Sequence, residues 1–245
     1  MRYQHILQAF FGSIWAMEPE KYEAIKEFLQ LKASGIDFSE EEIKQRIGAA
    51  APSKAAKSGG GIAVLPLEGI ISQKVNLARD ISGPGGTSTE RFAQAFKAAL
   101  ADLSIGAILI AVDSPGGTVY GVPELSDLIY KSRGQKPIVA SVNSLAASAA
   151  YWIASAADEV AITPSGEAGS IGVFAEHLDI SKFLDDEGVK PTLISAGKYK
   201  TEFSQNGPLA QLRIAGMFGA FEFIVLDRLA LGHAKGFVQG ARFEI

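Results

Sequence analysis

The sequence predicts an α/β fold with a parallel sheet, and three observations lead to this prediction. Short apolar runs alternate with helical patterns between about residues 62 and 162. The run over residues 105–112 is almost continuously apolar, as in a strand covered on both faces. Of the 245 residues, 47% are hydrophobic, which is enough to fill the core of one sizeable domain.

Residues 1–48 predict a small helical N-terminal arm. We expect an amphipathic helix over residues 6–17, which is too short to span a bilayer because spanning takes about 20 apolar residues. Pro19 can begin a second helix as its first residue. Ser39 with Glu42 forms a capping box, which predicts a third helical start.

Residues 49–61 lack both periodicity and bulk, so we expect a flexible linker there. A single catalytic domain is expected to follow over residues 62–207, with strands and helices taking turns. The patterns predict strands at residues 62–67, 105–112, 137–142, 159–162 and 192–195, and helices at residues 87–101, 123–133 and 147–157.

Charge and composition exclude several classes of protein. The net charge of −4 provides no field to attract nucleic acid, so no nucleic-acid partner is expected. Cysteine is absent, which excludes disulfides and thiolate metal sites and fits a reducing compartment such as the cytoplasm. Residues 208–245 predict a C-terminal helical segment whose internal charges argue against stable membrane insertion and favour a buried or oligomer-contacting helix.

The run Asp-Ser-Pro-Gly-Gly at residues 113–117 follows the apolar strand at 105–112. Ligands of open parallel sheets bind beyond the carboxyl ends of strands, which is where this run lies. Gly116 and Gly117 allow close approach of a substrate, so their amides can face a reacting carbonyl as half of an oxyanion hole. An ordinary strand-to-helix turn explains the same run equally well.

Ser148 lies in an Ala- and Ser-rich run at the start of the helix predicted from residue 147. The first N–H groups of a helix lack internal acceptors, so the Ala149 amide can stabilise an oxyanion while Ser148 attacks. A run of small residues also serves close helix packing, which is the structural alternative.

A serine nucleophile requires a base, and the run Gly-Lys-Tyr-Lys at residues 197–200 offers two lysines. The ordinary lysine pKa of about 10.4 must fall by several units before the amine can accept a proton. Lys200 and Lys198 both remain candidates, because their spacing does not separate them. A solvated surface lysine is the alternative for either.

Four motifs together carry a resemblance to a known family. They are the Asp-Ser-Pro-Gly-Gly run, Ala-Ala-Ser-Ala-Ala-Tyr at 146–151, Gly-Ser-Ile-Gly at 169–172 and the Gly-Lys-Tyr-Lys run. The set resembles the signal peptide peptidase A family of serine/lysine proteases over residues 61 to about 203. Residues 83–89 and 143–155 are most similar to its phage head-maturation branch, which is related to the minor capsid protein C of phage lambda.

This resemblance implies a Clp protease/crotonase-like spiral of β-β-α units and a role for each matching residue. Ser148 would be the nucleophile of an acyl-enzyme mechanism, Lys200 the general base, and Ser170 the hydroxyl that orients that lysine. Gly117 or Gly116, together with Ala149, would form the oxyanion hole.

The same resemblance implies assembly and partners. It implies a homo-oligomer without metal or other cofactor, in the host cytoplasm or the phage procapsid. Capsid, portal or scaffold proteins would be its substrates.

Several alternatives stay open at the level of sequence. A host-type signal peptide peptidase usually has a glycine pair where Ala149 and Ala150 stand here. A serine/histidine/aspartate triad would use His177, whereas a crotonase-like acyl-CoA enzyme would need neither Ser148 nor Lys200. A catalytically silent capsid-assembly protein is a further alternative. The C-terminal segment is shorter than the family pattern, which truncation, divergence or an altered reading frame would each explain.

Overall fold

The computed structural model describes residues 7, 10–36, 61–74, 86–196, 201 and 204–207. The expected capping box at Ser39, most of the expected linker and the C-terminal segment after residue 207 lie outside the described residues.

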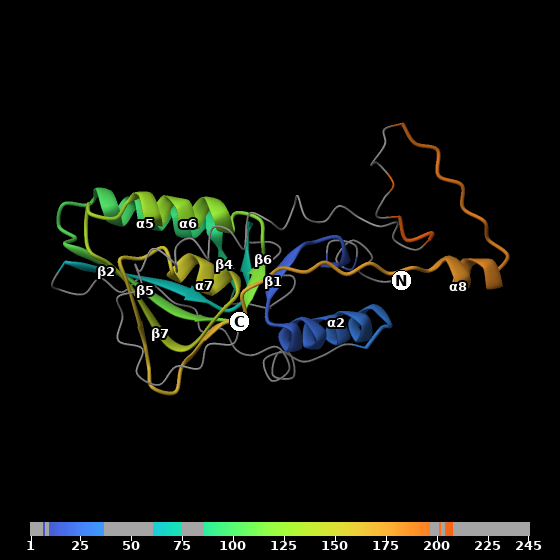
Figure 1. The fold of residues 1–245 in the computed structure, drawn as a ribbon, viewed down its shortest axis with the longest axis horizontal. Coiled ribbons are helices and arrows are strands. Elements are labelled where there is room, and N and C mark those ends of the chain that lie inside the picture. Colours follow the sequence, from blue (N-terminus) through green and yellow to red (C-terminus); the bar gives the residue numbers. More distant parts are fainter. Residues whose placement is uncertain are drawn as a thin grey trace.

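The main sheet is parallel, as the sequence predicts. Its strand order is β2-β5-β7-β8, and β9 pairs with the far part of β7 (Figure 1). The strands are β2 (Ile62–Glu68), β5 (Ala107–Ser114), β7 (Ile138–Ala147), β8 (Glu159–Ile162) and β9 (Glu167–Gly169).

A second, smaller sheet forms from short strands that the sequence analysis did not predict. Its order is β1-β6-β3-β4, and β1 pairs with β6 in the antiparallel sense. The strands are β1 (Trp15–Met17), β3 (Ile71–Ser72), β4 (Thr87–Ser88) and β6 (Gly116–Thr118). Strands of two or three residues carry too little alternation to be read from a sequence.

Besides the helical residues 7, 10 and 11, the described part of the chain contains the helices α2 (Pro19–Ala33), α5 (Thr89–Ala101), α6 (Val122–Lys131), α7 (Ala149–Ala154) and α8 (Ser181–Asp186). Pro19 begins α2 as expected, and the hydroxyl of Ser88 caps α5 by accepting from the Arg91 N–H at 3.3 Å. Strands β2 and β3 precede α5, and strands β5 and β6 precede α6. These consecutive β-β-α units confirm the predicted α/β fold class.

Of the expected elements, one is wrong in part and one is wrong. Residues 7, 10 and 11 of the expected amphipathic helix are helical, but residues 15–17 form the extended strand β1, because β6 offers them backbone partners. Residues 192–195 form no strand and pair with none of the described strands, and Leu193 and Ile194 are 53% and 97% exposed, so the apolar run there joins neither of the described sheets.

The buried apolar side chains form two clusters. The larger one fills the space between the main sheet and helices α5, α6 and α7. The smaller one joins α2 to β1 and includes Phe10, Trp15, Tyr22 and Ile25. Within the described residues, no helix is both long enough and apolar enough to cross a membrane.

Candidate functional site

Ser148 lies at the sharp turn between β7 and α7. Its backbone angles are φ 53° and ψ −111°. Among the residues that the structure describes, Ser148 and Ser170 are the two non-glycine residues with positive φ, and both have φ 53°. Such angles cost about 1–3 kcal/mol, and they persist at functional sites where the surroundings fix them. The strain therefore coincides with two of the predicted site residues.

Two carbonyl groups of the Gly-Ser-Ile-Gly motif hold Ser148 in place. Its backbone N–H donates to the Gly169 carbonyl at 2.8 Å, and its hydroxyl donates to the Gly172 carbonyl at 3.2 Å. The pairing of β9 with β7 sets this arrangement, because it brings Gly169 opposite Ala147. The family resemblance implies only that Ser170 of this motif orients a lysine, so the contacts of Gly169 and Gly172 with Ser148 were not expected.

Helix α7 begins at Ala149, directly after Ser148. All six of its residues are buried, so the small side chains also serve close packing, as the structural alternative predicts. The Arg133 side chain closes the far end by donating to the carbonyls of Ala156 at 2.8 Å and Ser155 at 3.0 Å. The turn that carries Ser148 is thus fixed from both ends of the helix.

The glycine pair lies on β6, beside the turn at Ser148. The Ser114 hydroxyl donates to the Gly69 carbonyl at 2.6 Å and accepts from the Gly116 N–H at 3.1 Å. This bond turns the Gly116 amide toward Ser114, so Gly117 is the better placed of the two oxyanion candidates. A Cβ at Gly117 would collide with the backbone of Ile71, which explains why only glycine fits there.

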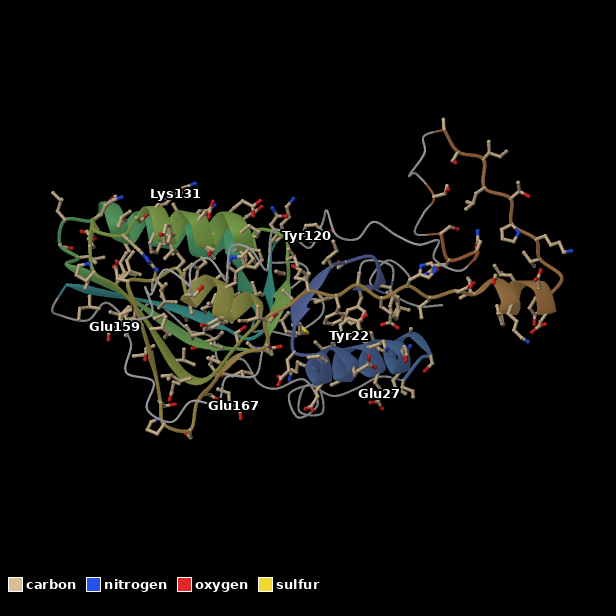
Figure 2. The ribbon with its side chains drawn as sticks, in the orientation of Figure 1. Tyr22, Glu27, Tyr120, Lys131, Glu159 and Glu167 are labelled. Carbon is tan, nitrogen blue, oxygen red and sulfur yellow. The ribbon has the colours of Figure 1, made fainter. Side chains whose placement is uncertain are left out.

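A cavity of about 810 Å³ lies beside these segments. The Glu18 carboxyl lines it, and its pKa is raised by burial and, next, by the charges of Glu20 and Glu167. Figure 2 labels Glu167, which belongs to β9. The lining includes Met17, Glu18, Ala147, Glu167, Ser170 and Gly172. The two glutamates belong to no motif, so the sequence alone does not indicate them.

The remaining predicted site residues divide into two groups. Lys200 and Lys198 lie outside the described residues, so their positions relative to Ser148 stay predictions. His177, the histidine of the alternative triad, contacts the Gly207 carbonyl through Nε2 at 3.1 Å, whereas the Ser148 hydroxyl contacts Gly172.

Comparison with known proteins decides which family this site resembles. Residues 131–213 match the model of peptidase family S49, and this span contains Ser148, Ser170 and Lys200. The predicted family resemblance is confirmed. Residues 113–117 lie outside the S49 match. The case for Gly116 and Gly117 as oxyanion candidates therefore depends on the geometry described above.

Two relatives of this chain come from phages. The head-tail preconnector protein GP5 of Enterobacteria phage P21 is 35% identical over 64% of this chain and 31% of its own length. The capsid assembly protease C of Escherichia phage lambda is 34% identical over 58% of this chain and 32% of its own length. The aligned part of this chain therefore spans about a third of the length of these relatives.

A solved structure of an enoyl-CoA hydratase/isomerase family member aligns with 78% of this chain and 69% of its own, at 13% identity and a TM-score of 0.35. The fold class therefore rests on the strand order and the β-β-α units described above.

Proposed function

We propose that this chain is a serine endopeptidase that processes capsid or scaffold proteins during the maturation of a phage head, in the procapsid or the host cytoplasm. The observation that carries the proposal is the strained turn at Ser148, which lies within the S49 match and beside a glycine-bearing strand. The names of the two phage relatives support the choice of substrate.

In the proposed reaction, neutral Lys200 takes the proton of the Ser148 hydroxyl as its oxygen bonds to the substrate carbonyl carbon. The N–H groups of Gly117 and Ala149 hold the resulting oxyanion. Collapse of the intermediate breaks the peptide bond, and Lys200 returns its proton to the departing amine. Water then hydrolyses the ester at Ser148, with Lys200 again as the base. Ser170 positions Lys200 through its hydroxyl.

Three substitutions test the dyad. Ser148→Ala and Lys200→Ala should each nearly abolish cleavage of co-expressed capsid and scaffold proteins, because nucleophile and base act as a unit. Lys198→Ala is the matched control, since it removes a lysine two residues away and should leave cleavage intact. Labelling by a serine-directed fluorophosphonate should likewise be nearly abolished in Ser148→Ala and Lys200→Ala and kept in Lys198→Ala.

Each contrary result has a definite meaning. Loss of cleavage in His177→Ala with activity kept in Lys200→Ala would replace the dyad with the triad. Intact capsid and scaffold proteins together with an unlabelled Ser148 would favour a silent assembly protein.

We also propose that the protein acts as a homo-oligomer. The described segment that leads toward Lys200 exposes Phe183, Leu193 and Ile194, which are 64%, 53% and 97% exposed. A second copy of the chain would cover such apolar surface. Mixing inactive Ser148→Ala with inactive Lys200→Ala tests whether the dyad forms between subunits. Restored cleavage would show a shared site, whereas a mixture that stays inactive would place both residues in one subunit.

A further inference from the structure

Strand β1 is paired on both edges. On one edge, Trp15, Ala16 and Met17 lie opposite Thr118, Gly117 and Gly116 of β6. On the other edge, the N–H groups of Trp15 and Phe174 each donate to the carbonyl of the other residue at 2.9 Å. Figure 1 shows β1 beside β6 at the junction between the main sheet and α2.

The two segments that enclose β1 are the two that surround Ser148. Strand β6 bears the proposed oxyanion amide, and residues 172–174 begin at the carbonyl that accepts the Ser148 hydroxyl. An extended substrate would find its backbone partners on these same two edges, by adding as a strand. In this structure β1 already satisfies them.

The register brings a carbonyl of β1 to the proposed oxyanion amide. The N–H of Glu18 donates to the Pro115 carbonyl at 3.0 Å, and the N–H of Val119 donates to the Ile14 carbonyl at 3.1 Å. Hydrogen-bonded pairs alternate along an antiparallel ladder, so the pair between these two, Ala16 with Gly117, is of the same kind. The Ala16 carbonyl therefore faces the Gly117 N–H, as a substrate carbonyl would.

Ser148 itself is buried, at 2% exposure. Gly116 connects the two features, because a Cβ placed on it would lie against the Ala16 carbonyl, Met17 and the Ala147 carbonyl. Residues 16 and 17 of β1 thus approach the residue that precedes the nucleophile.

We propose that β1 is an internal occupant of the peptide-binding groove, and that it must leave β6 before an extended protein segment can reach Ser148. This inference rests on the proposed peptidase function. The small side chain of Ala16 opposite Gly117 allows β1 to lie close to the glycine strand.

The anchor of β1 is separate from the main core. Trp15 is fully buried, and its Nε1–H donates to the Phe10 carbonyl at 3.0 Å. The centroid of its ring lies 4.9 Å from that of Phe10 and 5.7 Å from that of Tyr22. Tyr22, labelled in Figure 2, lies on α2. Its hydroxyl donates to the Glu176 carboxylate at 2.7 Å, which ties α2 to the chain after residues 172–174. Trp15 and Met17 belong to the smaller cluster, and Ala16 contributes only one methyl group to the larger cluster. Detachment of β1 therefore takes little apolar surface from the larger cluster.

A reversible lock tests the inference in the full chain. Trp15 and Thr118 form a non-hydrogen-bonded pair, in which Cα atoms lie about 4.5 Å apart, within reach of a disulfide. The chain has no cysteine of its own, and the buried Thr118 hydroxyl has no partner among the described residues. The double variant Trp15→Cys with Thr118→Cys should therefore fix β1 in the groove when oxidised and release it when reduced.

The measurement is the rate at which a fluorophosphonate labels Ser148. We expect the oxidised form to react at least about tenfold more slowly than the reduced form. Only molecules in which β1 has left the groove can react, so the observed rate is proportional to the fraction of such molecules. The reduced form should react faster than the parent chain, since it lacks the Trp15 anchor. Each single cysteine variant is a control, and its rate should not respond to oxidant.

A second pair of variants needs no disulfide. Trp15→Ala should accelerate labelling and increase hydrogen exchange at residues 15–17, whereas Phe28→Ala removes a ring from the same cluster outside β1 and should change both much less. Equal labelling of the oxidised and reduced locks would overturn the inference and leave the peptidase intact. An unlabelled Ser148 in every form, the released ones included, would refute the peptidase itself, and the inference with it.

Discussion

The strained turn at Ser148 predicts an unusual order of stability between two inactive variants. Ser148→Gly and Ser148→Ala both remove the hydroxyl bond to Gly172, so they differ mainly in the backbone strain at φ 53° and in the freedom of the unfolded chain. Alanine retains a strain of about 1–3 kcal/mol, which glycine relieves. Glycine loses about 0.5–1 kcal/mol through the greater freedom of its unfolded chain. The glycine variant should therefore be more stable by about 1 kcal/mol.

Ser132 provides the matched control. It is also buried, its hydroxyl also donates to a backbone carbonyl, that of Leu128 at 2.8 Å, and its φ is −90°. With no strain to relieve, Ser132→Ala should be more stable than Ser132→Gly by about 0.5–1 kcal/mol.

Urea denaturation of the four variants gives both differences directly from the midpoints when the slopes agree. The same order at both positions, with alanine more stable than glycine, would show that Ser148 carries no backbone strain and would remove the main structural support for its role.

Three further predictions concern the surroundings of the site. Gly117→Ala should destabilise the fold by up to about 3 kcal/mol in denaturant titrations, because its Cβ meets backbone that cannot rotate away, whereas at Gly106 the nearest atom is 3.8 Å distant and alanine should be accepted. Arg133→Ala should cost about 2–3 kcal/mol and lower the melting temperature, because it leaves carbonyls at the end of α7 without their charged donor, and a loss below about 0.5 kcal/mol would contradict this. Glu20→Gln should lower the raised pKa of Glu18 in a carbon-13 carboxyl titration. Because the pKa of Glu18 is raised in the folded state, the unfolded chain releases this proton at a lower pH than the folded protein does. The free energy of unfolding therefore decreases as the pH rises above 4.5, and this decrease should be smaller in Glu20→Gln.

The sequence predicted strands β2, β5, β7 and β8 of the main sheet and the place of Ser148 between a strand and a helix, because these features have strong local signals. Strand β8 has the expected bounds, and β5 and β7 are each displaced by a few residues. Ser148 was found from its motif and from its place after an apolar strand. Its environment was not predictable, because the carbonyls of Gly169 and Gly172 are identical in kind to every other carbonyl of the chain. Only the pairing of β9 with β7 brings them to Ser148.

Strand β1 was missed for a different physical reason. The apolar residues around Trp15 fit an amphipathic helix as well as a strand, and no local signal separates the two. What decides between them is a backbone edge on β6, about a hundred residues further along the chain. Tertiary pairing of this kind overrides local pattern and becomes visible only when the register is known.

The backbone and hydroxyl contacts that fix Ser148 do not come from β1, so they would persist when the site opens. The Ser148 N–H, hydroxyl and carbonyl are held by Gly169, Gly172 and the Trp152 N–H respectively. All three partners belong to the chain after β7, so departure of β1 from β6 removes none of these contacts. A nucleophile that is already positioned needs only an accessible groove, whereas one that β1 itself held in place would lose its geometry on opening. The covered serine and its strained turn are therefore compatible with a site that is assembled first and uncovered later.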